Sequence, residues 1–134
     1  MAMGKKNNSE KFQNNEDYFL KIKPAGNVPK ALLIHQHKIA KLFEFPMLNR
    51  RSSNVIGFAA GVEALRLVSE LNPSANIYTD SFTAYRWIND GKANTGDDLV
   101  TGSEEAMAYL KTIEESLKGL PNRSSIKYWA AIEV

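Results

Sequence analysis

The chain of 134 residues has the size of one domain, and its balance of 43% hydrophobic and 24% charged residues is typical of a globular protein. It contains no cysteine, which excludes thiol catalysis, cysteine-based zinc sites and a disulfide framework, and it has no apolar run long enough to span a bilayer. The net charge of +2 is unevenly placed, because residues 1–51 carry ten Lys/Arg and four acids whereas residues 52–134 carry seven and eleven. The basic first half favours a polyanionic partner, or it is only a solvated strand surface.

Residues 1–15 are polar and lack the apolar core of a secretory signal. We therefore expect a flexible tail at residues 1–15 and a single domain over residues 16–134. Since the absence of cysteine fits a reducing compartment, we expect a cytoplasmic protein without membrane association.

Three strands are predicted in the first third of the chain. Residues 18–23 alternate apolar and basic side chains, residues 30–37 are mostly apolar, and residues 39–45 follow a short join at Lys38. Short joins between successive strands predict an antiparallel meander.

The chain has two histidines, His35 and His37, which would share one face of the second predicted strand. They could form part of a metal site, but no acid or third imidazole lies nearby in sequence. Exposed or half-buried strand histidines are therefore the favoured interpretation.

The longest predicted helix covers residues 54–71 and ends before Pro73. One stripe of it is apolar at helical spacing. The apolar stripe consists of Phe58, Val62, Leu65 and Val68. Beside it runs a row of small residues that permits close approach of a neighbouring element, namely Gly57, Ala60, Gly61 and Ala64.

Residues 75–89 read A-N-I-Y-T-D-S-F-T-A-Y-R-W-I-N, a short strand at residues 76–79 that turns directly into a helix. Asp80 or Ser81 can cap this helix. Asp80 also lies at the carboxyl end of a strand, where open α/β sheets bind ligands. From these residues alone, the favoured interpretation is that Asp80 only caps the helix and binds no ligand.

The last third of the chain adds a polar loop, a helix and a strand. The loop covers residues 90–100, a capping box at Thr101–Glu104 starts the helix, and residues 125–134 form the final strand. The order β-β-β-α-β-α-α-β predicts an α/β fold with a five-stranded mixed sheet, helices packed against it, and the fourth strand parallel to the first.

This element order, together with residues 52–88, resembles the ribonuclease H fold. One motif is I-Y-T-D-S at residues 77–81, and the other is S-S-N-V-I-G-F-A-A-G-V-E-A-L from Ser52, which is similar to the family's T-N-N-x-x-E-L/F-x-A-x-x-x-A-L. The segment W-I-N-D-G-K-A-N-T-G, which contains Lys92, is similar to the segment that follows this strand in some bacterial members.

The resemblance implies hydrolysis of the RNA strand of an RNA–DNA hybrid by two metal ions, usually Mg²⁺, held by carboxylates from several elements. Only Asp80 matches one of these carboxylates. The helix glutamate falls on Gly57, and the first-strand acid falls near Lys23, whose charge opposes metal binding. The last acid has no counterpart before Val134.

Five other acids could in principle replace the missing ligands: Glu63 and Glu70 of the helix, Asp17 of the first strand, and Asp97 and Asp98 of the loop. Glu63 lies about 240° around the helix from Gly57 and is interpreted as facing solvent, and Glu70 lies about 220° around by the same count. Asp17 is at the wrong end of the first strand, which leaves Asp97 and Asp98 of the loop as the acids that could reach.

The resemblance also supplies nucleic-acid-binding candidates. Ser53 and Asn54 match the polar pair that touches the nucleic-acid groove in the family, although helix capping explains them equally well. Lys92 is the third candidate. Tyr85 and Trp87 could stack on a base or a partner, with core packing favoured for at least one of them.

We therefore expect a ribonuclease H-like pseudoenzyme, without a cofactor, that binds nucleic acid or a protein; erosion of the carboxylates and of the groove motif slightly favours a protein partner. The alternative is an active Mg²⁺-dependent RNA–DNA hybrid ribonuclease whose ligands are displaced or supplied by another chain. An unrelated α/β domain is the third interpretation.

Overall fold

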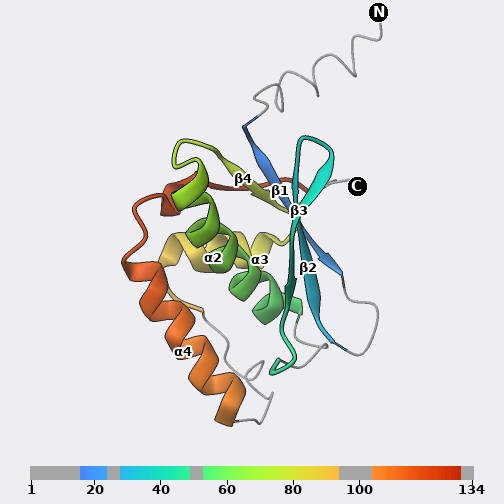
Figure 1. Ribbon diagram of the computed structural model, residues 1–134. Helices are drawn as coiled ribbons and strands as arrows, with labels where there is room; N and C mark the ends of the chain where they lie inside the picture. The colour runs from blue at the N-terminus through green and yellow to red at the C-terminus, as the bar shows by residue number, and fades with distance from the viewer. Residues whose placement is uncertain (1–15, 24–27, 49–52, 94–103, 131–134) are drawn as a thin grey trace, which may run out of the picture.

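The computed structural model describes residues 16–23, 28–48, 53–93 and 104–130. The predicted tail at residues 1–15 and the predicted capping-box residues 101–103 lie outside these ranges. Five strands form one mixed sheet in the order β3-β2-β1-β4-β5. The protein is therefore an α/β fold with a five-stranded mixed sheet and helices α2, α3 and α4 (Figure 1).

The strands β1 (Tyr18–Lys23), β2 (Lys30–His35) and β3 (Lys38–Glu44) form the predicted antiparallel meander. The short strand β4 (Ile77–Thr79) lies parallel to β1, also as predicted, and β5 (Ile126–Tyr128) lies parallel to β4.

Two predicted strand ends are wrong. β2 stops at His35, because Gln36 and His37 form a two-residue turn in which both have positive φ angles, 52° and 66°. Such turns match the twist of the strands they join, and histidine tolerates positive φ better than most residues. His37 therefore lies in the turn, and the two histidines do not share a strand face. His35 instead stacks on Tyr18, with ring centroids 4.1 Å apart.

The final strand was predicted over residues 125–134, of which 131–134 lie outside the described residues, and in the described part it is shorter than predicted. β5 has three residues and follows a short 3-10 helix over Arg123–Ser125. Its only neighbour among the described strands, β4, is itself three residues long, so the regular pairing ends with β4. One further bond, from the Trp129 N–H to the Thr79 carbonyl at 2.9 Å, continues the pairing past Tyr128.

Helix α2 (Ser53–Leu71) lies between the sheet and α4 (Glu104–Lys118), as Figure 1 shows. This position explains why α2 is buried on nearly all sides, including the predicted apolar stripe and the row of small residues. Helix α3 (Phe82–Asp90) packs beside α2 near β5 and buries Ala84, Trp87 and Ile88.

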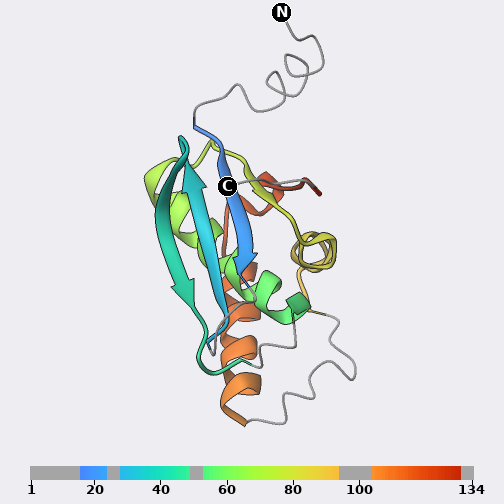
Figure 2. The same cartoon turned by 90° about the vertical axis from the view of Figure 1, so that its right-hand side faces the viewer.

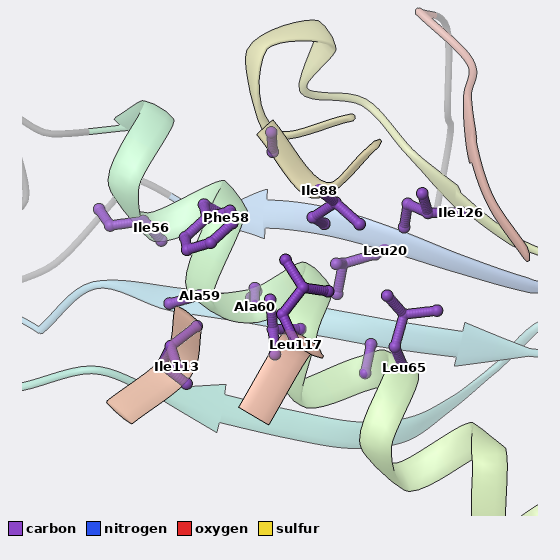
Figure 3. Close-up of a cluster of buried hydrophobic side chains, with 14 of the residues drawn as sticks. Leu20, Ile56, Phe58, Ala59, Ala60, Leu65, Ile88, Ile113, Leu117 and Ile126 are labelled. Carbon is purple, nitrogen blue, oxygen red and sulfur yellow. The ribbon is translucent and has the colours of Figure 1, made fainter. Parts of the chain in front are cut away.

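The core fills the space between α2, the sheet and α4. Figure 3 shows side chains from both the sheet and the helices in one cluster, among them Leu20 of β1, Leu65 of α2, Leu117 of α4 and Ile126 of β5. In Figure 2, α2 and α4 lie behind β1, β2 and β3 and α3 lies to one side, so the near face of these strands carries no helix among the described residues.

Candidate functional site

The carboxyl ends of β1 and β4 meet at one edge of the sheet. Leu20 is the register partner of Thr79, so Asp80, the next residue of the chain, comes level with Lys21 and Ile22. In an open α/β sheet this edge is the usual place for a ligand. Asp80 therefore lies at the edge where such sheets bind ligands.

Asp80 is half-buried, and opposing influences act on its carboxyl. Burial raises its pKa above the ordinary value of 3.8, whereas a hydrogen bond with the backbone of Ile22 and the positive charge of Lys21 favour the ionised form. Its Oδ1 atom is buried and has no hydrogen-bond partner among the described residues. The site thus contains a carboxylate that is only partly compensated.

The cation that acts on Asp80 is Lys21, not the predicted Lys23. Lys21 and Lys23 are two residues apart and therefore lie on the same face of β1, but Lys21 is half-buried and Lys23 is exposed. The sequence does not give the register of β1 against β4, which decides which lysine comes level with Asp80.

Gly57 occupies a closely packed position at the start of α2. A Cβ atom at Gly57 would lie 3.0 Å from Ser81 Oγ, 3.1 Å from Ser81 Cβ and 3.2 Å from Ala84 Cβ. The two Cβ atoms are bonded directly to the backbone, so no side-chain rotation can move them away. Glutamate at this position, as in the family motif, does not fit without movement of α3.

Ser81, rather than Asp80, caps helix α3. The Ser81 Oγ atom accepts a hydrogen bond from the Ala84 N–H at 3.1 Å, and the Ser81 N–H donates to Thr79 Oγ1 at 3.2 Å. These bonds turn the chain from β4 into the helix within two residues. The interpretation of Asp80 as only a cap is therefore wrong.

The described residues do not fit a two-magnesium centre. Lys21 stands beside Asp80, Gly57 supplies no carboxylate, and no group of three His, Cys, Asp or Glu that could hold a metal occurs among the residues the structure describes. Asp97 and Asp98, the predicted substitutes in the loop, lie outside the described residues.

Two other acids are engaged elsewhere. The Asp17 Oδ1 atom accepts the Asn76 N–H at 3.2 Å, at the amino end of β1 as predicted. Glu63 does not simply face solvent. It accepts hydrogen bonds from Arg66 at 2.8 Å and from the Tyr109 hydroxyl at 3.2 Å, which joins α2 to α4.

The nucleic-acid-binding candidates lie in different parts of the molecule. Ser53 is exposed at the first residue of α2 and Asn54 is half-buried, one turn before Gly57. Lys92 is exposed just beyond the far end of α3, so the whole length of this nine-residue helix, about 14 Å at 1.5 Å per residue, separates it from Asp80.

Sequence reasoning missed a second site beside Asp80. A hollow of about 490 Å³ lies where the end of β4, the first turns of α3 and β5 meet, and its lining is Tyr78, Phe82, Tyr85, Lys127, Tyr128 and Trp129. Of the two aromatic residues predicted to stack or pack, Tyr85 lines this hollow. Trp87 is buried and packs against Phe58 in the core, with ring centroids 6.0 Å apart.

The chain matches no protein-family model and no curated protein sequence. In the described part of the chain, none of the helices combines the length and apolar character that crossing a bilayer requires.

Proposed function

We propose that this chain is a ribonuclease H-like domain that has lost nuclease activity and serves as a binding module for nucleic acid or a protein. The antiparallel meander, the helix that follows it, and the parallel placement of β4 beside β1 support the family assignment. So does Asp80 at the carboxyl end of β4, within the I-Y-T-D-S motif.

The close contact of Gly57 with Ser81 and Ala84 is the observation that carries the loss of activity. Two-metal hydrolysis needs several carboxylates around one point. At one ligand position the chain has Gly57, where even an added Cβ atom would press on Ser81 and Ala84, and on β1 the residue level with Asp80 is a lysine. A lysine charge beside a lone carboxylate competes with metal ions for it.

A cleavage assay tests this function. The purified protein is incubated with a labelled RNA–DNA hybrid and Mg²⁺ or Mn²⁺, beside an Asp80→Asn variant. We expect no cleavage that depends on Asp80, so any residual activity is the same in both proteins and comes from a contaminant. Cleavage by the wild type that disappears in Asp80→Asn would refute the proposed loss of activity.

One observation favours the alternative, an active Mg²⁺-dependent hybrid ribonuclease with displaced or external ligands. The Oδ1 atom of Asp80 is buried without a partner among the described residues, and a buried carboxylate with a raised pKa is typical of functional sites. Titration with Mn²⁺ followed by its electron paramagnetic resonance signal separates the two functions, because only the alternative predicts binding that Asp80→Asn abolishes.

A further inference from the structure

The aromatic hollow is built from three segments that are distant in sequence. Tyr78 of β4 pairs with Lys127 of β5, and Thr79 pairs with Tyr128, so the two strands bring these side chains together. Phe82 and Tyr85 enter from consecutive turns of α3, whose start is fixed by the Ser81 cap. The hollow is therefore held by regular secondary structure.

The rings of the hollow contact one another but remain open to solvent. Phe82 and Tyr128 meet edge to face with centroids 5.2 Å apart and an interplanar angle of 74°. Tyr85 lies 6.2 Å from Phe82 and 6.4 Å from Tyr128. Phe82 nevertheless stays 51% exposed and Tyr128 39% exposed, so these rings do not serve mainly to fill the core.

The charge around the hollow is positive. Lys127 is the one charged residue of the lining, which contains no acid. Of the six lysines on the described strands, Lys127 is the one that lies on β4 or β5, the strands of the hollow; the other five lie on β1, β2 and β3. The charge of Asp80, the acid nearest in sequence, is partly compensated by Lys21 and the backbone of Ile22. This surface favours an anionic ligand.

We propose that the aromatic hollow binds a base of a single-stranded nucleic acid. Stacking of bases on exposed aromatic rings combined with lysine contacts to phosphate is the chemistry by which single strands are held. The volume of about 490 Å³ suits a splayed base with its sugar, and the bases of a duplex are not free to enter it. This inference rests on the proposed binding role and not on the loss of nuclease activity.

Fluorescence anisotropy with labelled single strands of about 12 nucleotides, within the usual site sizes, tests the inference. We expect Phe82→Ala and Tyr128→Ala to weaken binding about 5- to 150-fold each, because one base stack contributes about 1–3 kcal/mol. Met107→Ala, which removes a side chain of equal 51% exposure from α4, is the matched control and should leave binding unchanged.

Lys127→Ala provides a second test that does not disturb the rings. Its side chain is exposed, so we expect a folded protein whose salt dependence of binding falls by about 0.7 in logarithmic slope, the value for one phosphate contact on a single strand. Lys111→Ala on α4 is the control. Circular dichroism verifies that each variant is folded.

Several results would overturn the inference. These are the absence of single-strand binding at low salt, equal binding by the wild type and all three hollow variants, or tighter binding of duplex or hybrid than of single strands. Competition by a mononucleotide as effective as the oligonucleotide would reassign the hollow to a free nucleotide. A co-purifying protein released by the same variants would reassign it to a protein partner.

The two proposals fail separately. Hybrid cleavage that requires Asp80, with single-strand binding still sensitive to Phe82→Ala, would refute the proposed function and leave this inference standing. If the protein does not cleave the hybrid and the hollow variants bind single strands as well as the wild type does, the proposed loss of activity stands and this inference is refuted.

Discussion

The Asp80 carboxyl ionises less readily in the folded protein than in the unfolded chain. Burial is the largest influence on its pKa and outweighs both the Ile22 backbone and Lys21. A raised pKa means that the folded state binds more protons than the unfolded state between pH 3.8 and the raised value. Stability contributed by the protonated form is therefore complete below pH 3.8 and is lost as the pH rises through the raised pKa.

Asp80→Asn should raise the melting temperature at neutral pH, because asparagine keeps the shape of the protonated acid without the cost of ionisation. The gain should shrink towards pH 4, where the wild type is itself protonated. Asp17, whose pKa is also raised by burial, is present in both proteins, so its contribution cancels in the difference. A melting temperature that falls at pH 7, or a difference independent of pH, would contradict this assignment.

Sequence reasoning located Asp80 but not its surroundings. The I-Y-T-D-S motif predicts a carboxylate at the end of a strand, since the pattern of apolar residues fixes both the strand and the following helix. Whether Lys21 or Lys23 comes level with it depends on pairing with a distant segment. The positive φ angles of Gln36 and His37 were missed because neither residue is glycine or asparagine.

Helices α2 and α3 approach closely because two glycines of α2 face α3. At Gly57 the neighbours are Ser81 and Ala84, whose Cβ atoms have no rotational freedom. At Gly61 the nearest atom is the Cδ1 atom of Ile88, the far end of a flexible side chain. The prediction that the row of small residues permits close approach is confirmed, and Gly57 is the less tolerant of the two positions.

Gly57→Ala should destabilise the protein by about 1–2 kcal/mol, despite alanine's better helix propensity, because α3 must shift and strain the Ser81 cap. Gly119→Ala is the control, since its added Cβ would meet nothing closer than 3.8 Å and should be neutral or slightly stabilising. Urea unfolding followed by circular dichroism measures both. Equal stability of Gly57→Ala and the wild type would show that α3 moves freely.

At the scale of the molecule, charge separates between the sheet and the outer helix α4 among the described residues. The strands are basic, whereas α4 carries four glutamates and two lysines. The alternating and helical patterns were sufficient to predict the element order, the meander and the parallel β4. The aromatic hollow was not predictable, because its residues come from β4, α3 and β5 and no periodicity within one segment links them.

Strand β3 forms one edge of the sheet and exposes Ile39 by 59% and Leu42 by 44%. An exposed apolar edge strand invites pairing with another copy of the chain. Here the register shifts opposite Leu33 and Ile34, and two exposed lysines, Lys38 and Lys41, stand along the strand. A bulge and edge lysines are both devices that oppose such aggregation.

Replacing the lysines by Lys38→Thr and Lys41→Val should therefore promote concentration-dependent self-association without altering the fold. Light scattering of the double variant against the wild type measures this, with Lys111→Ala of α4 as the control for a simple loss of positive charge. An unchanged scattering profile would show that the bulge alone protects the edge. In that case the lysines of β3 would contribute only to the basic surface. The expected result means that they also prevent a strand of another copy from pairing with β3 and extending this five-stranded sheet.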